Sequence, residues 1–202
     1  MKSIVCIKAY NAPEIDKKEV LRYAKVGVGT IECNALLDEC IADVADKLSY
    51  KVCYIRLPIN ICGEEIDLGF TRVHSRSLAL CLDCCSEIIL FCATVGSGID
   101  RLVAKYSLTT PSRAVMLQAL GSERVEALCD AFCADIAAEE AERGCKTKPR
   151  FSPGYGDLPL ELQRDIFTLL DPAKNIGVTL GADLFMSPIK SVTAIIGIKK
   201  EV

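Results

Sequence analysis

The segment Arg150-Phe151-Ser152-Pro153-Gly154-Tyr155 carries more information than any other stretch of this sequence. Proline restricts the backbone and glycine frees it, so the chain can follow an unusual path and let a ligand approach the main chain. Arg150 offers a planar fork of donors suited to a carboxylate, and Tyr155 offers a ring and a hydroxyl. From the residues alone, a tight surface turn remains an equally good interpretation.

The hydrophobic spacing on both sides of this segment predicts a mixture of helices and strands. The longest predicted helix lies between Pro111 and Gly144, an uninterrupted apolar run predicts a buried strand over 87–94, and the β-branched segment 191–198 predicts a final strand. The remaining predicted elements are strands over 3–9, 52–57 and 65–68 and helices over 16–23, 32–48, 76–82, 98–105 and 160–170. Because helices and strands do not alternate strictly, the sequence favours an α+β fold.

The composition is that of a globular protein. A length of 202 residues, of which 50% are hydrophobic, leads us to expect a single domain over residues 1–202. The net charge of −3 argues against a nucleic-acid surface, which needs clustered Lys and Arg. No segment has the roughly 20 apolar residues of a membrane helix, and the start of the chain lacks a signal-peptide pattern. We therefore expect a cytoplasmic protein that binds neither nucleic acid nor a membrane.

The twelve cysteines are dispersed, and most of them lie in apolar runs where a thiol packs as a small hydrophobic group. Cys81-Leu82-Asp83-Cys84-Cys85 contains one C-x-x-C pair, and Cys129 with Cys133 could supply a second pair for zinc. Packing in a core is the simpler interpretation, so we expect no metal site.

The glycine-rich turn Gly96-Ser97-Gly98 follows a predicted strand and opens a predicted helix, as phosphate-binding turns do. A dinucleotide site would need another glycine three residues later, where Arg101 stands. The only histidine is His74, which leaves no persuasive Ser–His–Asp or Cys–His arrangement. We therefore expect no catalytic residue of the hydrolase type.

Three spaced segments, in one order, resemble a known family. Arg150 to Tyr155 is similar to an Arg-x-x-x-Gly-Tyr motif, and Met186-Ser187-Pro188-Ile189-Lys190-Ser191-Val192 resembles a Met-x-Pro-x-x-Ser-Val pattern. Residues 57–66 resemble a Pro-x-Asn-x-x-Gly-acid-acid-Ile hairpin. Together they resemble the activation (reactivation) domain of cobalamin-dependent methionine synthase over about residues 27–198, and most closely its short, free-standing forms.

This resemblance implies a bent, twisted antiparallel sheet flanked by helices, with S-adenosylmethionine (AdoMet) bound between the sheet and the Arg150 segment. Arg150 would pair with the carboxylate of AdoMet, and Glu64 or Glu65 would face its ammonium group. The cofactor-binding residues that the resemblance implies are Arg150, Phe151, Ser152, Pro153, Gly154, Tyr155, Glu64 and Glu65.

In that family the domain presents the methyl group of AdoMet to a corrinoid, while flavodoxin or a similar donor supplies one electron. The resemblance therefore implies an AdoMet-binding reactivation subunit of a split methionine synthase, with cobalamin carried by a partner protein. Reactivation of another corrinoid methyltransferase, and a docking module that no longer binds AdoMet, are the alternatives. The segment Gly156-Asp157-Leu158-Pro159 departs from the more proline-rich run of the family.

Overall fold

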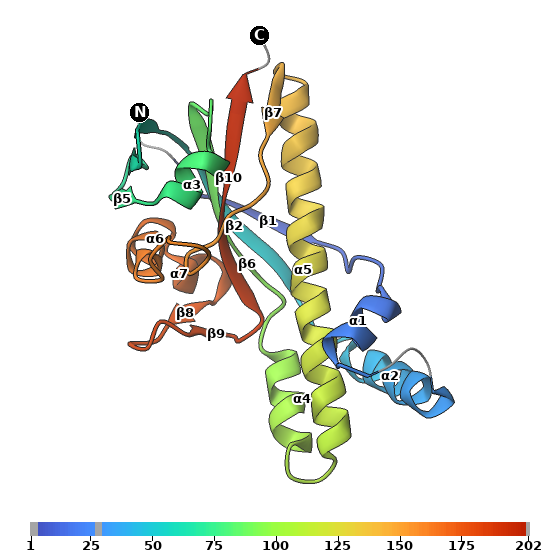
Figure 1. The fold of residues 1–202 in the computed structure, drawn as a ribbon. Helices are drawn as coiled ribbons and strands as arrows, with labels where there is room; N and C mark the ends of the chain where they lie inside the picture. The colour runs from blue at the N-terminus through green and yellow to red at the C-terminus, as the bar shows by residue number, and fades with distance from the viewer. Residues whose placement is uncertain (1–3, 27–29, 201–202) are drawn as a thin grey trace.

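A large antiparallel sheet organises the protein, whose computed structural model describes residues 4–26 and 30–200 (Figure 1). Ser3, where we expect the first strand to begin, lies outside the described residues. The sheet contains β1 (Cys6–Tyr10), β2 (Tyr50–Pro58), β6 (Glu87–Thr94), β10 (Ser191–Lys200) and β7 (Cys145–Thr147), in the spatial order β1-β2-β6-β10-β7. All of its strand pairs are antiparallel.

Strand β6 lies at the centre of the sheet and is covered on both faces. Its residues from Ile88 to Thr94 are all buried, which explains why an uninterrupted apolar run predicted it. It pairs with β10 from Ser191↔Thr94 to Ile198↔Glu87. The last strand of the chain therefore lies inside the sheet.

The second half of helix α5 (Pro111–Ala141) covers one face of the sheet. Its side chains at helical spacing pack against alternate residues of β2, β6 and β10, as in the contact of Phe132 with Phe91, whose ring centroids are 4.8 Å apart. Burying each such side chain contributes about 1.5–3 kcal/mol. The α5 residues in this layer are Val125, Leu128, Cys129, Phe132 and Ile136.

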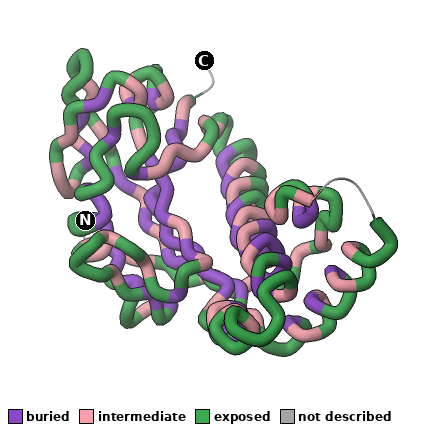
Figure 2. Tube along the Cα trace, turned by 60° about the horizontal axis from the view of Figure 1, so that its bottom comes forward, coloured by how far each residue is buried: buried purple, intermediate pink, exposed green. Residues whose placement is uncertain are grey.

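The opposite face is covered by short elements. They are α3 (Arg76–Cys81), α6 (Leu162–Leu170), α7 (Pro172–Ile176), the small sheet β3 (Asn60–Cys62), β4 (Glu65–Asp67) and β5 (Arg72–His74), and the pair β8 (Thr179–Leu180) and β9 (Met186–Ser187). Their apolar residues form a second core with Ile55, Leu90 and Ile195 of the large sheet. Figure 2 shows the buried residues running through the middle strands and along one side of α5.

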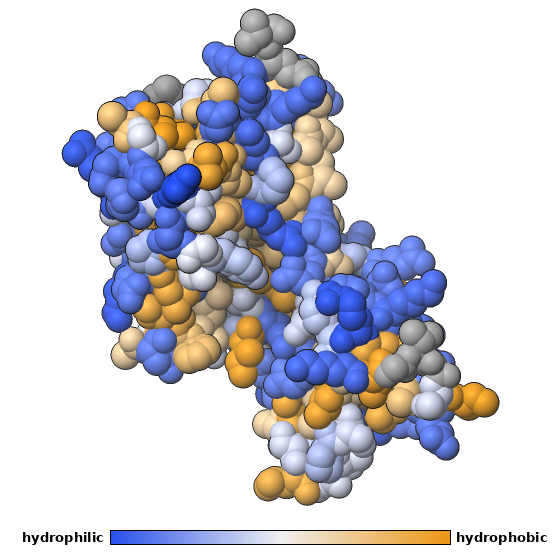
Figure 3. Space-filling model, viewed as in Figure 1, coloured by the Kyte–Doolittle hydropathy of each residue, from blue (hydrophilic) through white to orange (hydrophobic). Residues whose placement is uncertain are grey.

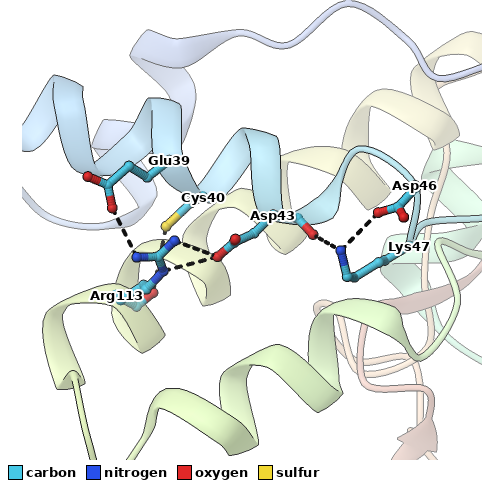
Figure 4. Close-up of polar contacts among 6 residues, drawn as sticks. All are labelled: Glu39, Cys40, Asp43, Asp46, Lys47 and Arg113. Carbon is cyan, nitrogen blue, oxygen red and sulfur yellow. Dashed lines mark hydrogen bonds and ion pairs between the residues drawn. The ribbon is translucent and has the colours of Figure 1, made fainter.

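A third core lies where α1 (Lys17–Tyr23), α2 (Ile31–Val44) and α4 (Gly98–Tyr106) pack on the first half of α5. Figure 4 shows how Arg113 of α5 ties α2 to this helix: its guanidinium donates to Asp43 (2.7 Å) and Glu39 (2.9 Å). Cys40 lies between these carboxylates on α2, and burial raises the pKa of its thiol to about 11. The thiol therefore stays neutral beside the ion pairs.

Glu123 and Arg124 form a buried ion pair on α5, with 4% and 1% of their side chains exposed. The arginine also donates to the carbonyl oxygens of Pro13 (2.6 Å) and Glu14 (2.7 Å), and Glu123 accepts from the Asp16 N–H (3.1 Å). These bonds hold the segment before α1 against α5. Burying two charged side chains costs free energy, and this cost is offset because the segment before α1 supplies hydrogen-bond partners to both of them.

The sequence-based predictions agree with most of this architecture. The predicted helices over 16–23, 76–82 and 160–170 correspond to α1, α3 and α6, and the strand over 87–94 coincides with β6. The predictions missed β3, β5, β7, α7 and the β8–β9 pair, which are too short for a periodic pattern. Within the described residues, no helix is both long and apolar enough to span a bilayer.

We expect the Arg124→Ala variant to lose about 3–5 kcal/mol of unfolding free energy, because it leaves the Glu123 carboxylate buried without a counter-charge. Urea denaturation measures this loss. Arg22→Ala, which removes an exposed i,i+3 pair with Glu19, is the matched control and should leave the free energy of unfolding nearly unchanged, because exposed ion pairs contribute little. Equal stability of the two variants would contradict a structural role for the buried pair.

Candidate functional site

Strand β10 has one edge that is paired only in part. On the side away from β6 it pairs with β7 at Ile198–Lys200, and then with the chain that follows β7. Lys148 N–H donates to the Gly197 carbonyl (2.8 Å), and Phe151 and Ile195 exchange two N–H···O bonds of 2.8 Å. Beyond Phe151 the chain turns away, and no described strand pairs with Ser191–Thr193 on this edge.

The free edge of β10 offers main-chain hydrogen-bonding groups. In an antiparallel strand the N–H and C=O groups of alternate residues point to the same side. The N–H and C=O groups of Ile195 point to Phe151. The N–H and C=O groups of Thr193, two residues earlier, therefore point to the same edge of β10, at a place where the neighbouring segment has already turned away. This edge therefore presents an unpaired N–H and C=O to whatever lies beside it.

A cavity of about 370 Å³ lies at this edge. Pockets of this size are in the range that holds small molecules of a few hundred daltons. Its lining residues are Glu126, Arg150, Phe151, Ser152, Pro153, Tyr155, Gln163, Met186, Ser191, Val192 and Thr193. They come from α5, the 150–155 segment, α6, β9 and β10, so the cavity spans the sheet edge between the two layers that cover it.

The Arg150 side chain extends toward α5, where its guanidinium pairs with two carboxylates. It bonds Glu126 and Asp130, the latter at 2.6 Å, and 25% of its side chain is exposed. Cys129 and Cys133 lie on the same helix, and burial raises the pKa of both thiols, so they face the guanidinium as neutral groups. Arg150 and Glu126 thus set opposite charges side by side in the cavity wall.

The turn after Arg150 is held in place by two glycines and an aspartate. Gly154 (φ +87°) and Gly156 (φ +56°) adopt left-handed conformations, and a Cβ on Gly156 would lie 2.7 Å from Ser77 Oγ. Asp157 then accepts from Ser75 Oγ (2.6 Å) and from the N–H groups of Arg76 (2.8 Å) and Ser77 (3.1 Å), capping α3. The Gly156–Asp157 departure from the family pattern is therefore a structural anchor for the turn.

The structure brings together most of the predicted site residues. Arg150, Phe151, Ser152, Pro153 and Tyr155 line the cavity, and Gly154 lies in their turn without lining it.

Glu64 and Glu65 lie elsewhere. They flank the imidazole of His74, with oxygen-to-nitrogen distances of 3.2 and 3.0 Å, and Glu64 lines a separate cavity of about 700 Å³ beside α3. Neither residue lines the Arg150 cavity. Their predicted contact with a ligand ammonium stays a prediction.

Sequence reasoning missed Glu126 and Gln163. Glu126 lies on the long helix α5, where a glutamate usually faces solvent. Gln163 lies on the short helix α6, and the apolar pattern that predicts this helix gives no role to a single glutamine. Met186, Ser191 and Val192 belong to the Met-x-Pro-x-x-Ser-Val pattern, but the pattern carried no role for them. Only the fold shows that these residues meet the Arg150 segment.

The alternative sites are not supported by the geometry. A Cβ on Gly98 would lie 2.0 Å from the Lys47 carbonyl oxygen, so this glycine is needed where the segment after α2 meets the start of α4. The Cys81 thiol donates to the Pro149 carbonyl (3.5 Å), and all twelve cysteines are free. In the part of the chain that the structure describes, no three His, Cys, Asp or Glu side chains gather as a metal site would require.

No family model and no curated protein matches this sequence. The structure is similar to the crystal structure of the MetH reactivation domain bound to S-adenosylhomocysteine (AdoHcy), with a TM-score of 0.68 and 16% sequence identity. The match covers 96% of this chain and 78% of that one. At this identity the likeness shows the fold alone, and it confirms the predicted α+β fold of the methionine synthase activation domain, a curled antiparallel sheet with flanking helices.

We expect Asp157→Asn to lower the melting temperature at pH 7, because the Ser75 hydroxyl and the α3 N–H groups hold the pKa of this carboxyl well below its usual range. The stabilisation is present above the unfolded pKa of about 3.9 and is lost as the pH falls toward the folded pKa. The gap between the wild-type and variant melting temperatures should therefore narrow below about pH 4. A gap that stays constant down to pH 2 would contradict this role.

Proposed function

We propose that the protein binds AdoMet in the cavity between the 150–155 segment and the free edge of β10. The observation that carries this proposal is the pair of opposite charges, Arg150 and Glu126, in the wall of a small cavity that is otherwise lined by apolar and neutral groups. The shared fold with a domain solved in complex with AdoHcy supports it. A zwitterionic amino acid joined to a nucleoside has the complementary chemistry.

Arg150 is suited to the carboxylate of AdoMet. Its guanidinium has five N–H donors, so the bonds to Asp130 and Glu126 leave further donors for a ligand. The Asp130 side chain is 74% exposed, and an exposed ion pair is worth less than about 1 kcal/mol. A ligand carboxylate can therefore replace Asp130 at little cost.

Glu126 is suited to the cationic groups of AdoMet. Its carboxylate lies beside Arg150 and is 40% exposed. The ammonium nitrogen and the carboxylate carbon of AdoMet are bonded to the same α-carbon, so both charges of the zwitterion can meet the adjacent Arg150 and Glu126 side chains together. We assign to Glu126 the part that the sequence-based prediction assigned to Glu64 or Glu65.

We further propose that the protein is a reactivation subunit for a corrinoid protein. Bound AdoMet supplies an activated methyl group, which the corrinoid of a partner would accept while a flavodoxin-like or other donor provides an electron. The chain's own residues contribute by holding AdoMet in one orientation and lowering the entropic barrier to transfer. The partner would be a methionine synthase cobalamin module or another corrinoid protein.

An apolar rim beside the cavity supports docking. Tyr155 lines the cavity and is 68% exposed. Phe185, which precedes the lining residue Met186, and Ile189, two residues before the lining residue Ser191, are 76% and 63% exposed. Figure 3 shows apolar side chains among polar ones over the α6–α7 and β8–β9 side of the molecule. Exposed aromatic and aliphatic side chains of this kind are typical of interface anchors.

We expect Arg150→Ala to weaken AdoMet binding about tenfold to hundredfold, because a hydrogen bond to a charged group contributes about 1.5–3 kcal/mol. Isothermal titration calorimetry measures the dissociation constant. Arg101→Ala, an exposed arginine on α4 that bonds Ser97, is the matched control and should bind as the wild type does. Unchanged affinity in the Arg150 variant, or no binding to the wild type, would count against the proposed site.

We expect Glu126→Gln to weaken AdoMet binding and to weaken binding of 5′-methylthioadenosine much less, because the latter lacks the ammonium group. The same calorimetric titration applied to Glu64→Gln and Glu65→Gln decides which carboxylate faces the ligand. A loss in one of those two variants, with Glu126→Gln unaffected, would support the sequence-based assignment instead.

A further inference from the structure

Gln163 is a polar residue at a position where packing alone would favour an apolar one. It lies on α6 with 6% of its surface exposed, next to Leu162 and near Ile166, both of which pack into the core. It lines the Arg150 cavity, and among the described residues none donates a hydrogen bond to its side-chain oxygen Oε1. A residue of the cavity wall therefore carries a buried amide acceptor that has no protein donor in the described chain.

Such a group carries a free-energy cost. Leaving a buried acceptor unsatisfied destabilises a protein, and most buried polar groups in proteins have a partner. Within the described chain, Glu140 Oε2 is also buried without a partner, but the second oxygen of Glu140 receives bonds from Arg56 and Arg143. Gln163 instead lines a cavity, which points to a donor on a ligand.

The two polar ends of the cavity lie on different sides of the sheet. Glu126 belongs to α5 and Gln163 to α6, and these helices cover opposite faces (Figure 1). Between them the cavity is lined by the free edge of β10 and by the side chains of Phe151 and Met186. A ligand whose charged head meets Arg150 and Glu126 would reach Gln163 with its other end.

We propose that Gln163 selects the base of the nucleoside, its Oε1 accepting a hydrogen bond from the exocyclic amino group of adenine. This inference rests on the proposed AdoMet site. A glutamine amide matches adenine because it accepts from the amino group and donates to N7. A 6-oxopurine presents two acceptors there, O6 and N7, and one amide cannot donate to one of them without leaving its own oxygen facing the other. The site therefore takes 6-aminopurine nucleosides and discriminates against 6-oxopurines.

The surroundings of Gln163 favour the base over the ribose. The apolar surfaces of Phe151, Pro153 and Met186 suit the flat face of a purine ring. Ribose hydroxyls would lose hydration beside such groups. The low exposure of Gln163 also suits the edge of a base inserted deeply.

The test compares AdoHcy with S-inosylhomocysteine, which differs from it only in the 6-oxo group of the base. Calorimetry on the wild type should give at least about tenfold tighter binding of AdoHcy, as a good bidentate contact provides. Gln163→Met, of similar size but without an acceptor, should bind AdoHcy about tenfold more weakly and the two ligands equally. Gln118→Met, the same change on α5 outside this cavity, is the matched control and should keep the wild-type preference.

Two further readouts separate base selection from structural support. The ligand-free Gln163→Met protein should melt at or above the wild-type temperature, because the unsatisfied acceptor is gone. Binding of 5′-methylthioadenosine should weaken in Gln163→Met and remain unchanged in Arg150→Ala. A lower melting temperature together with an unchanged base preference would overturn the inference.

The outcomes for the two proposals differ. If the wild type binds AdoHcy and S-inosylhomocysteine equally, base selection by Gln163 is wrong while the AdoMet site stands. If Gln163→Met keeps the preference for AdoHcy, another group reads the base, and the inference is again wrong. If the wild type binds neither ligand, both proposals are wrong.

Discussion

Strand β10 has two edges with different partners, and the site depends on this difference. One edge pairs with β6 from Ser191 to Ile198, while the other pairs with β7 and the following segment only as far as Ile195. The first edge places β10 inside the sheet, and the second leaves main-chain groups available next to Thr193. Because buried backbone groups need partners, the place where the second edge ends is a natural position for a ligand.

The turn after Phe151 is what ends the pairing. Positive φ angles at Gly154 and Gly156 reverse the chain, and Asp157 fastens it to the first turn of α3. The turn is therefore supported from the layer opposite α5, whereas the Arg150 side chain reaches back to α5 itself. The cavity therefore has one wall from each layer. Its charged end contains Glu126 of α5, and its neutral end contains Gln163 of α6.

Two sets of buried polar side chains in the described chain differ in how their hydrogen bonds are satisfied. Glu123 and Arg124 satisfy each other and the segment before α1, so they contribute to one specific packing arrangement. Gln163 Oε1 finds no donor in the described chain. An unsatisfied buried polar group lowers the stability of the folded state, and proteins retain such groups mainly where binding requires them.

The elements with long apolar stripes or runs, which include α5, β6 and β10, were predictable from the amino-acid sequence, and so was the likeness of three motifs to one fold. The spacing of apolar residues along the sequence indicates which face of each element is buried, so these features can be predicted without knowledge of tertiary contacts. The folded arrangement was needed to show that Glu126 and Gln163 line one cavity with the Arg150 segment, and that Glu64 and Glu65 lie beside His74 instead. The reason is physical: a cavity wall is assembled from side chains far apart in the chain, and their meeting depends on strand order and on where a turn leaves the sheet, which no local pattern encodes.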